Sequence, residues 1–77
     1  LQIVDRNYAR PLTDELVAHQ LGLSTSHFRF LFKSAVGVPF HRYLVNLRLE
    51  KAHAMLVDGT RTVSEVAGAV GFQGLSH

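Results

Sequence analysis

An internal repeat at a spacing of 49 residues most constrains the fold of this chain. Shifting the sequence by 49 positions superimposes four identical residue pairs, which are Thr13 with Thr62, Val17 with Val66, Ala18 with Ala67, and Gly22 with Gly71. In each copy a threonine is followed by an Ala-x-x-x-Gly segment and then by an apolar residue. This order is typical of a capped helix followed by a tight turn, so we expect the same helix and turn twice.

The rest of the pattern predicts helices only, because no stretch shows the alternation of apolar and polar residues typical of a strand. Turn residues divide the chain into five expected helices, at about 1–9, 14–21, 25–36, 39–58 and 63–70. Thr13, Ser24 and Thr62 are the expected N-caps, and Thr62 with Glu65 matches a capping box. Pro39 is expected in the first turn of the long helix, where proline is tolerated.

Apolar residues recur at helical spacing and mark the expected core. In the third segment the inward positions are Phe28, Leu31, Phe32 and Ala35. In the long helix a single apolar stripe is expected, formed by Phe40, Tyr43, Leu44, Leu47, Ala52, Met55 and Leu56. A chain of 77 residues forms one small domain, which buries only about 60% of the surface of its unfolded chain. We therefore expect modest stability.

Positive charge gathers in the middle of the sequence. The net charge of the chain is +2, but residues 29–51 hold five cations against one acid, and the flanking segments each have a balance of −1. A basic segment between nearly neutral ends favours an anionic partner that meets the middle of the chain. An ordinary solvated helix surface would show the same pattern, so charge alone leaves both interpretations open.

The sequence contains no pattern typical of an enzyme, a metal site or a membrane span. Cysteine is absent, and the five histidines form neither an HExxH motif nor a His-x-x-x-His pair. Neither G-x-S-x-G nor G-x-x-x-x-G-K occurs, and no run of about 18 apolar residues is present. We therefore expect no catalytic residue, no metal ion, no cofactor and no membrane partner.

The spacing within each repeat is typical of a helix-turn-helix, in which a second helix crosses the first and projects outward. Ala18 and Ala67 are small enough for two helices to cross closely. Gly22 and Gly71 suit a turn with positive φ, and the apolar residue after each glycine is expected to fill the corner.

With these motifs, the sequence resembles the C-terminal DNA-binding domain of the AraC/XylS family of bacterial transcription regulators. The resemblance rests on PLTDELVAHQLGLSTSHFRFLFKSAVGVPFHRYL, NLRLEKAHAML and TVSEVAGAVGF followed by SH, and covers nearly the whole chain. It implies an all-α domain with two homeodomain-like, three-helix helix-turn-helix units joined by a long linker helix. The expected division is 1–37 for the first unit, 38–59 for the linker helix and 60–77 for the start of the second unit.

In the family, the second unit continues beyond the position of His77 into a recognition helix and a closing helix. We therefore expect an incomplete second unit, taken from a larger regulator. The resemblance implies sequence-specific binding of double-stranded promoter DNA, with recognition helices in successive major grooves. An effector ligand would bind a domain outside this chain, RNA polymerase is a candidate partner, and the expected location is the bacterial cytoplasm at the nucleoid. Activation and repression both stay open, as does the operator sequence.

The resemblance also assigns DNA contacts. Ser26, Arg29 and Phe30 occupy the family's main base-facing positions, and Arg29 is suited to bidentate hydrogen bonds with guanine O6 and N7. Many family members carry arginine where this chain has Phe30. Three interpretations of Phe30 therefore stay open: a contact with a thymine methyl group, a face that contacts fewer bases, or packing against a neighbouring protein surface.

The remaining assignments concern the DNA backbone and the second unit. Ser24 and Thr25 open the first recognition helix, and Thr25, His27 and Lys33 are the expected phosphate contacts. Arg48 matches a recurrent family arginine and is expected mainly as a brace between the two halves. The residues expected to open the second recognition helix are Leu75, Ser76 and His77.

A helical protein-interaction module without DNA binding is the alternative function, since a fold does not determine a function. The mild net charge and Phe30 in place of a cation favour it slightly. Salt distinguishes the two functions, because phosphate binding weakens steeply with salt and a hydrophobic interface does not.

Overall fold

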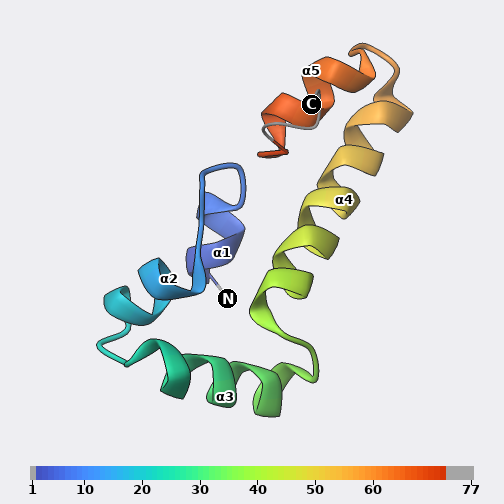
Figure 1. The fold of residues 1–77 in the computed structure, drawn as a ribbon. Coiled ribbons are helices and arrows are strands. Elements are labelled where there is room, and N and C mark those ends of the chain that lie inside the picture. Colours follow the sequence, from blue (N-terminus) through green and yellow to red (C-terminus); the bar gives the residue numbers. More distant parts are fainter. Residues whose placement is uncertain (1, 73–77) are drawn as a thin grey trace.

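The computed structural model describes residues 2–72, and in this part of the chain helices are joined by short turns, without a strand (Figure 1). Its helices are α1 (Gln2–Asn7), α2 (Asp14–Gln20), α3 (Thr25–Val36), α4 (Phe40–Asp58) and α5 (Val63–Ala69). The molecule is elongated, with extents of 41 × 22 × 21 Å. Helices α2 and α3 pack together near the start of α4, and α5 packs near its end (Figure 1). The predicted all-α fold with a long connecting helix is confirmed.

Side-chain caps begin three of the helices, as the sequence predicts. Thr13 Oγ1 and Ser24 Oγ each accept a hydrogen bond from the backbone N–H three residues further on, at 3.2 and 3.1 Å. At α5 the capping box is complete: Thr62 Oγ1 accepts from the Glu65 N–H at 3.2 Å, and Glu65 Oε1 accepts from the Thr62 N–H at 2.9 Å. These bonds satisfy donors that a first turn leaves unpaired, and they lower the pKa of Glu65.

The two copies of the repeat form the same turn. Backbone hydrogen bonds of 2.9 Å run from the N–H to the carbonyl at equivalent positions, from Leu23 to Ala18 and from Phe72 to Ala67. The glycine inside each turn has a positive φ, 72° at Gly22 and 95° at Gly71. This left-handed conformation favours glycine, which confirms the expected role of both residues.

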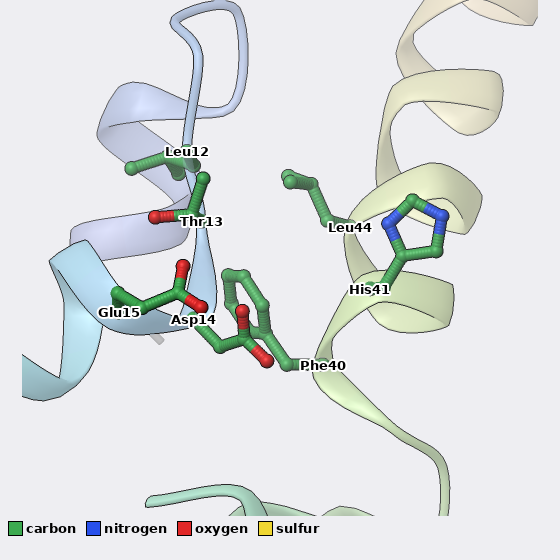
Figure 2. A pocket seen from close by; sticks show the side chains of 7 residues that line it. All are labelled: Leu12, Thr13, Asp14, Glu15, Phe40, His41 and Leu44. Atoms are coloured by element: carbon green, nitrogen blue, oxygen red, sulfur yellow. The ribbon is translucent and has the colours of Figure 1, made fainter. Parts of the chain in front are cut away.

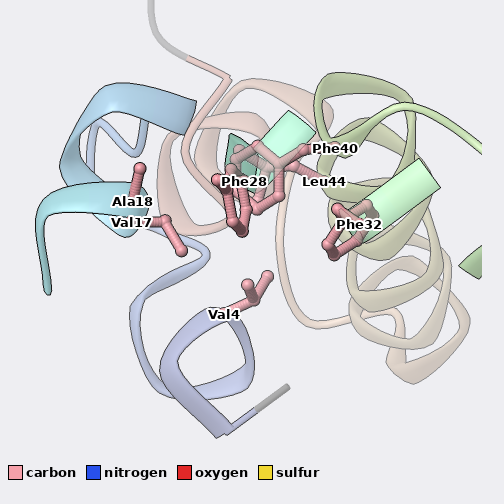
Figure 3. Packing of buried hydrophobic residues seen from close by; sticks show 7 residues of the cluster. All are labelled: Val4, Val17, Ala18, Phe28, Phe32, Phe40 and Leu44. Atoms are coloured by element: carbon pink, nitrogen blue, oxygen red, sulfur yellow. The ribbon is translucent and has the colours of Figure 1, made fainter. Parts of the chain in front are cut away.

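A hydrophobic core holds α1, α2, α3 and the start of α4 together (Figure 3). Its buried members are Val4, Val17, Ala18, Phe28, Phe32, Phe40 and Leu44. Phe28, Phe32 and Phe40 meet pairwise, with ring centroids 5.7, 5.5 and 5.4 Å apart and the rings tilted or edge-on. Aromatic pairs favour this geometry. The core therefore packs against one side of α3 and leaves the opposite side of the helix exposed.

Helix α4 changes its buried face along its length. Its first half turns Phe40 and Leu44 into the core, whereas Val45, Leu49 and Leu56 line an apolar groove against α5. At 3.6 residues per turn these two sets lie on different sides of the helix. The single apolar stripe expected from the sequence is therefore wrong, and Leu56 stays 41% exposed.

Helix α1 ends earlier than expected, at Asn7 rather than near Ala9. The side-chain Nδ2 of Asn7 donates to the Ile3 carbonyl at 2.8 Å, and the Arg10 N–H donates to the Asn7 carbonyl at 2.9 Å. Such side-chain and turn bonds compete with continuation of a helix. Pro39 also differs slightly: it is the extended N-cap of α4, with ψ 152°, and lies just before the first turn.

The buried face of α3 is narrower than the spacing of its apolar residues predicts. Phe28 and Phe32 are buried, whereas Leu31 is 42% exposed and Ala35 is also exposed. The expectation that Leu31 and Ala35 point inward is therefore wrong. The physical reason is that α2 and α4 pack on one side of α3 only.

Candidate nucleic-acid interface

The outward side of α3 brings together four of the residues predicted to contact DNA, Ser26, His27, Phe30 and Lys33. Its exposed polar and aromatic side chains are Ser26, His27, Phe30, Lys33 and Ser34. Phe30 is 68% exposed and lies two residues from each of the buried Phe28 and Phe32. Since two residues correspond to a rotation of about 200° on a helix, Phe30 occupies the centre of the outward face.

The first turn of α3 presents small groups. Ser24 is exposed, and its Oγ accepts the cap hydrogen bond from His27, so its hydroxyl hydrogen is still available to donate. Thr25 is half-buried, and Ser26 is exposed. Backbone N–H groups at the start of a helix favour phosphate, and short side chains let a phosphate approach them.

Arg29 points toward α2. Its Nε donates to a carboxylate oxygen of Asp14, and its Nη2 lies 3.5 Å from Glu15 Oε1. The guanidinium lowers the pKa of Asp14, and the carboxylate raises the pKa of Arg29. The guanidinium edge that would bind a base thus already has acidic partners. The Arg29 side chain is 57% exposed, and exposed ion pairs contribute little to stability, so DNA can compete for it.

Arg48 connects α4 to the end of α1. Its Nε donates to the Tyr8 carbonyl at 2.7 Å, and its Nη2 donates to the Arg10 carbonyl at 2.9 Å. Its guanidinium carbon also lies 6.0 Å from the centroid of the Phe72 ring, after α5. Partial burial lowers the pKa of Arg48. Arg48 thus connects α4 with the end of α1 and with the residue that follows the second turn, as expected of a brace.

A close backbone approach strengthens the same junction. A Cβ atom added at Gly71 would lie 2.9 Å from the Ala9 carbonyl oxygen and 3.0 Å from that of Tyr8. At the equivalent Gly22 such an atom would meet nothing within 4 Å. The turn after α5 is therefore pressed against the end of α1.

Internal contacts engage several cations of the basic segment. Arg29 and Arg48 have the partners described above, and Lys51 Nζ lies 5.8 Å from the centroid of a tyrosine ring. Lys33 and Arg42 are exposed and form no ion pair within the described part of the chain. Lys33 is therefore the cation of α3 that is most readily offered to an anionic partner.

A small cleft separates the start of α2 from α4 (Figure 2). It has a volume of about 140 Å³ and is lined by Leu12, Thr13, Asp14, Glu15, Phe40, His41 and Leu44. Figure 2 shows Phe40 pointing from α4 toward the first turn of α2. Ligand pockets usually measure about 300–1,000 Å³, so this cleft is a packing feature between helices.

Two further kinds of site can be assessed over residues 2–72. In that range, no group of three or more His, Asp or Glu side chains is placed to hold a metal ion. The same range contains no helix that is both long and apolar enough to cross a membrane. The predicted contacts Leu75, Ser76 and His77 lie outside the described residues.

Known proteins resemble this chain in sequence and in structure. Residues 17–77 match a helix-turn-helix domain family. The lactose operon transcription activator of Staphylococcus xylosus is 27% identical over 73 residues, which are 95% of this chain and 26% of that protein. The chain thus spans about a quarter of the length of that relative.

A solved structure matches as well. The C-terminal domain of the two-component response regulator yesN from Fusobacterium nucleatum subsp. nucleatum superposes with a TM-score of 0.93 at 30% sequence identity, covering 97% of this chain and 78% of that chain. The family match includes α3 and the second copy of the repeat. The chain therefore belongs to the AraC-type helix-turn-helix domains, a family of DNA-binding domains of transcription regulators.

Proposed function

We propose that this chain binds double-stranded promoter DNA with α3 in a major groove, as the DNA-binding part of a bacterial transcription regulator. The observation that carries this proposal is the outward face of α3, which lies opposite the aromatic core and keeps Lys33 exposed. A major groove is about 12 Å wide and admits an α-helix. The small residues at the start of α3 allow its first turn to enter.

The second copy of the repeat would supply a second contact. We propose a first unit at 1–37, a linker helix at 38–59 and the start of a second unit at 60–77. Helix α4 has 19 residues and therefore spans about 28 Å, which is close to the ~34 Å of one turn of B-DNA. A straight helix of this length, braced by Arg48, supports recognition helices in successive major grooves, with Leu75, Ser76 and His77 opening the second one.

Within α3 we propose two kinds of contact. Ser26, Arg29 and Phe30 face the bases, and Arg29 exchanges its carboxylate partners on α2 for the DNA. The residues proposed to position the helix on the phosphates are Ser24, Thr25, His27 and Lys33. An effector-binding domain outside this chain, contact with RNA polymerase and a location in the bacterial cytoplasm at the nucleoid belong to the same proposal.

The salt dependence of duplex binding tests this proposal. Binding to a fluorescent duplex is measured by anisotropy between about 50 and 200 mM salt, the range over which phosphate contacts weaken strongly. The Lys33→Gln variant should reduce the slope of log K against log salt by about 0.9, the value for one phosphate contact. Arg6→Gln removes an equal charge from an exposed position on α1 and should leave the slope unchanged. Binding that does not respond to salt, or equal effects of the two variants, would contradict the proposal.

A protein-interaction module is the second candidate, and exposed apolar surface favours it. Phe30 is 68% exposed, and the groove between α4 and α5 is lined only by apolar residues. Contiguous apolar surface often marks a protein interface. A chain that binds no duplex at low salt would favour this second function.

A further inference from the structure

We propose that Phe30 is the residue through which α3 selects its DNA site, by contact with the C5-methyl groups of thymine. This inference rests on the proposed binding of α3 in a major groove. It names the base chemistry that this helix face accepts, which is a thymine-containing half-site rather than a guanine-rich one.

The shape of the outward face makes Phe30 the first side chain to reach the floor of a groove. Ser26 and Ser34 lie four residues before and after it, and residues four apart are neighbours on a helix surface. Both serine side chains are short, so the phenyl ring stands above them along the helix. The longer His27 and Lys33 side chains lie three residues away and flank the ring.

Phe30 contributes little to the domain itself. The aromatic contacts recorded over residues 2–72 join Phe28, Phe32, Phe40 and Tyr43, and none includes Phe30. An apolar ring exposed to water gains free energy when a partner covers it. The ring therefore suits contact with an apolar group outside the domain.

The major-groove edge of DNA offers one such group. Guanine, adenine and cytosine present hydrogen-bond donors and acceptors there, and thymine adds a methyl group. A phenyl ring placed over donors or acceptors removes their water without replacing its hydrogen bonds, which is unfavourable. A ring placed on a methyl group buries apolar surface instead. Phe30 therefore both favours thymine and disfavours G·C pairs at the same position.

The arginine beside Phe30 is less directly placed for a base contact. Arg29 lies one residue earlier, about 100° around the helix, and its guanidinium must give up Asp14 and Glu15 on α2 before it contacts a base. Among the candidates of α3 for base contact, Phe30 points outward and has no aromatic partner among the described residues. Ser26 also points outward, but its side chain is small.

Replacement of thymine by deoxyuridine tests the proposal, because it removes only the methyl group. A preferred duplex is first selected from a random library with the 77-residue chain at low salt, and each thymine is then replaced in turn. For the unaltered chain we expect about a fourfold loss of affinity at one or two thymines, from the burial of one methyl group each. For Phe30→Ala the same replacements should leave affinity unchanged, whereas Phe30→Leu should keep part of the effect. Phe30 is exposed, so both variants should fold normally, which circular dichroism checks.

Several outcomes would overturn the inference. Selection of a guanine-rich site, with the preference lost in Arg29→Ala and kept in Phe30→Ala, would assign base selection to Arg29. Salt-sensitive binding without a preference for thymine would also overturn it. Both results would leave the proposed DNA binding intact. Absence of duplex binding at low salt would instead contradict the proposed function itself and assign Phe30 to a protein interface.

Discussion

Replacement of Gly71 by alanine tests whether the second copy of the repeat is pressed against the first unit. Gly71 has a φ of 95°, where a side chain is strained by about 1–2 kcal/mol. The new Cβ would lie 2.9 Å from the Ala9 carbonyl oxygen, so the backbone at this junction must move. Overpacking of this kind costs about 1–3 kcal/mol. We therefore expect Gly71→Ala to lower the free energy of unfolding by about 2–5 kcal/mol.

Gly22→Ala is the matched control, since Gly22 has the equivalent place in the repeat. Its φ is also positive, at 72°, but a Cβ there would meet nothing within 4 Å. Only the backbone strain of about 1–2 kcal/mol is expected. Urea unfolding followed by circular dichroism measures both losses. In a domain this small, 1 kcal/mol also shifts Tm by about 4–8 °C. Equal losses in the two variants would refute the close approach between Gly71 and the end of α1.

Three further predictions follow from single contacts. Arg48→Met should lower the free energy of unfolding by about 2–3 kcal/mol, measured in urea, because two backbone carbonyls lose a charged donor. Arg48→Lys should recover only part of this stability. Unchanged stability in Arg48→Met would contradict the brace. Thr62→Ala should lower the free energy of unfolding by about 1 kcal/mol and speed amide hydrogen exchange in α5. Ser64→Ala, at an exposed position, should change neither quantity. Equal exchange rates in the two variants would contradict the cap. Arg29→Gln should raise the pKa of Asp14, measured by carboxyl NMR titration. A lowered carboxyl pKa stabilises the fold above about pH 4, and this stabilisation is lost as the pH falls through the pKa of the folded state. The variant should lack this pH-dependent stabilisation. An unchanged Asp14 pKa would contradict the ion pair.

Local chemistry accounts for what the sequence predicts well. The caps at Thr13, Ser24 and Thr62 and the turns at Gly22 and Gly71 depend on residues within one helical turn of each other. Such contacts are determined by neighbours in the chain, so a single sequence is enough to place them. These positions place α2, α3 and α5.

Contacts between helices were harder to predict, because they depend on crossing angles. Arg29 and Asp14 are 15 residues apart, and only the angle between α2 and α3 brings them together. Two acids in the first turn of α2 and a cation in the second turn of α3 are the signal that indicates the pair. The change of buried face along α4 depends on α5, which packs on the side of α4 that carries Val45 and Leu49, and neither residue belongs to the expected stripe.

The candidate interface was predictable in part. The outward positions of Ser26 and Phe30 follow from the spacing of the buried phenylalanines, which a sequence shows directly. The internal partners of Arg29 and Arg48 could not be predicted in the same way, because each depends on a second element that packs nearby. Charge along the sequence therefore overstates the positive charge that the folded chain offers to DNA.

An NMR titration of the isotope-labelled chain with a duplex tests the placement of α3 on DNA most directly. We expect shift changes to concentrate on the outward side of α3, at Ser26, Phe30 and Lys33, and to weaken as salt is added. The exposed apolar residues Leu49 and Val63, which line the groove between α4 and α5, should stay unchanged. Changes confined to that groove, or no change at low salt, would contradict the assignment of α3 as the DNA-binding helix.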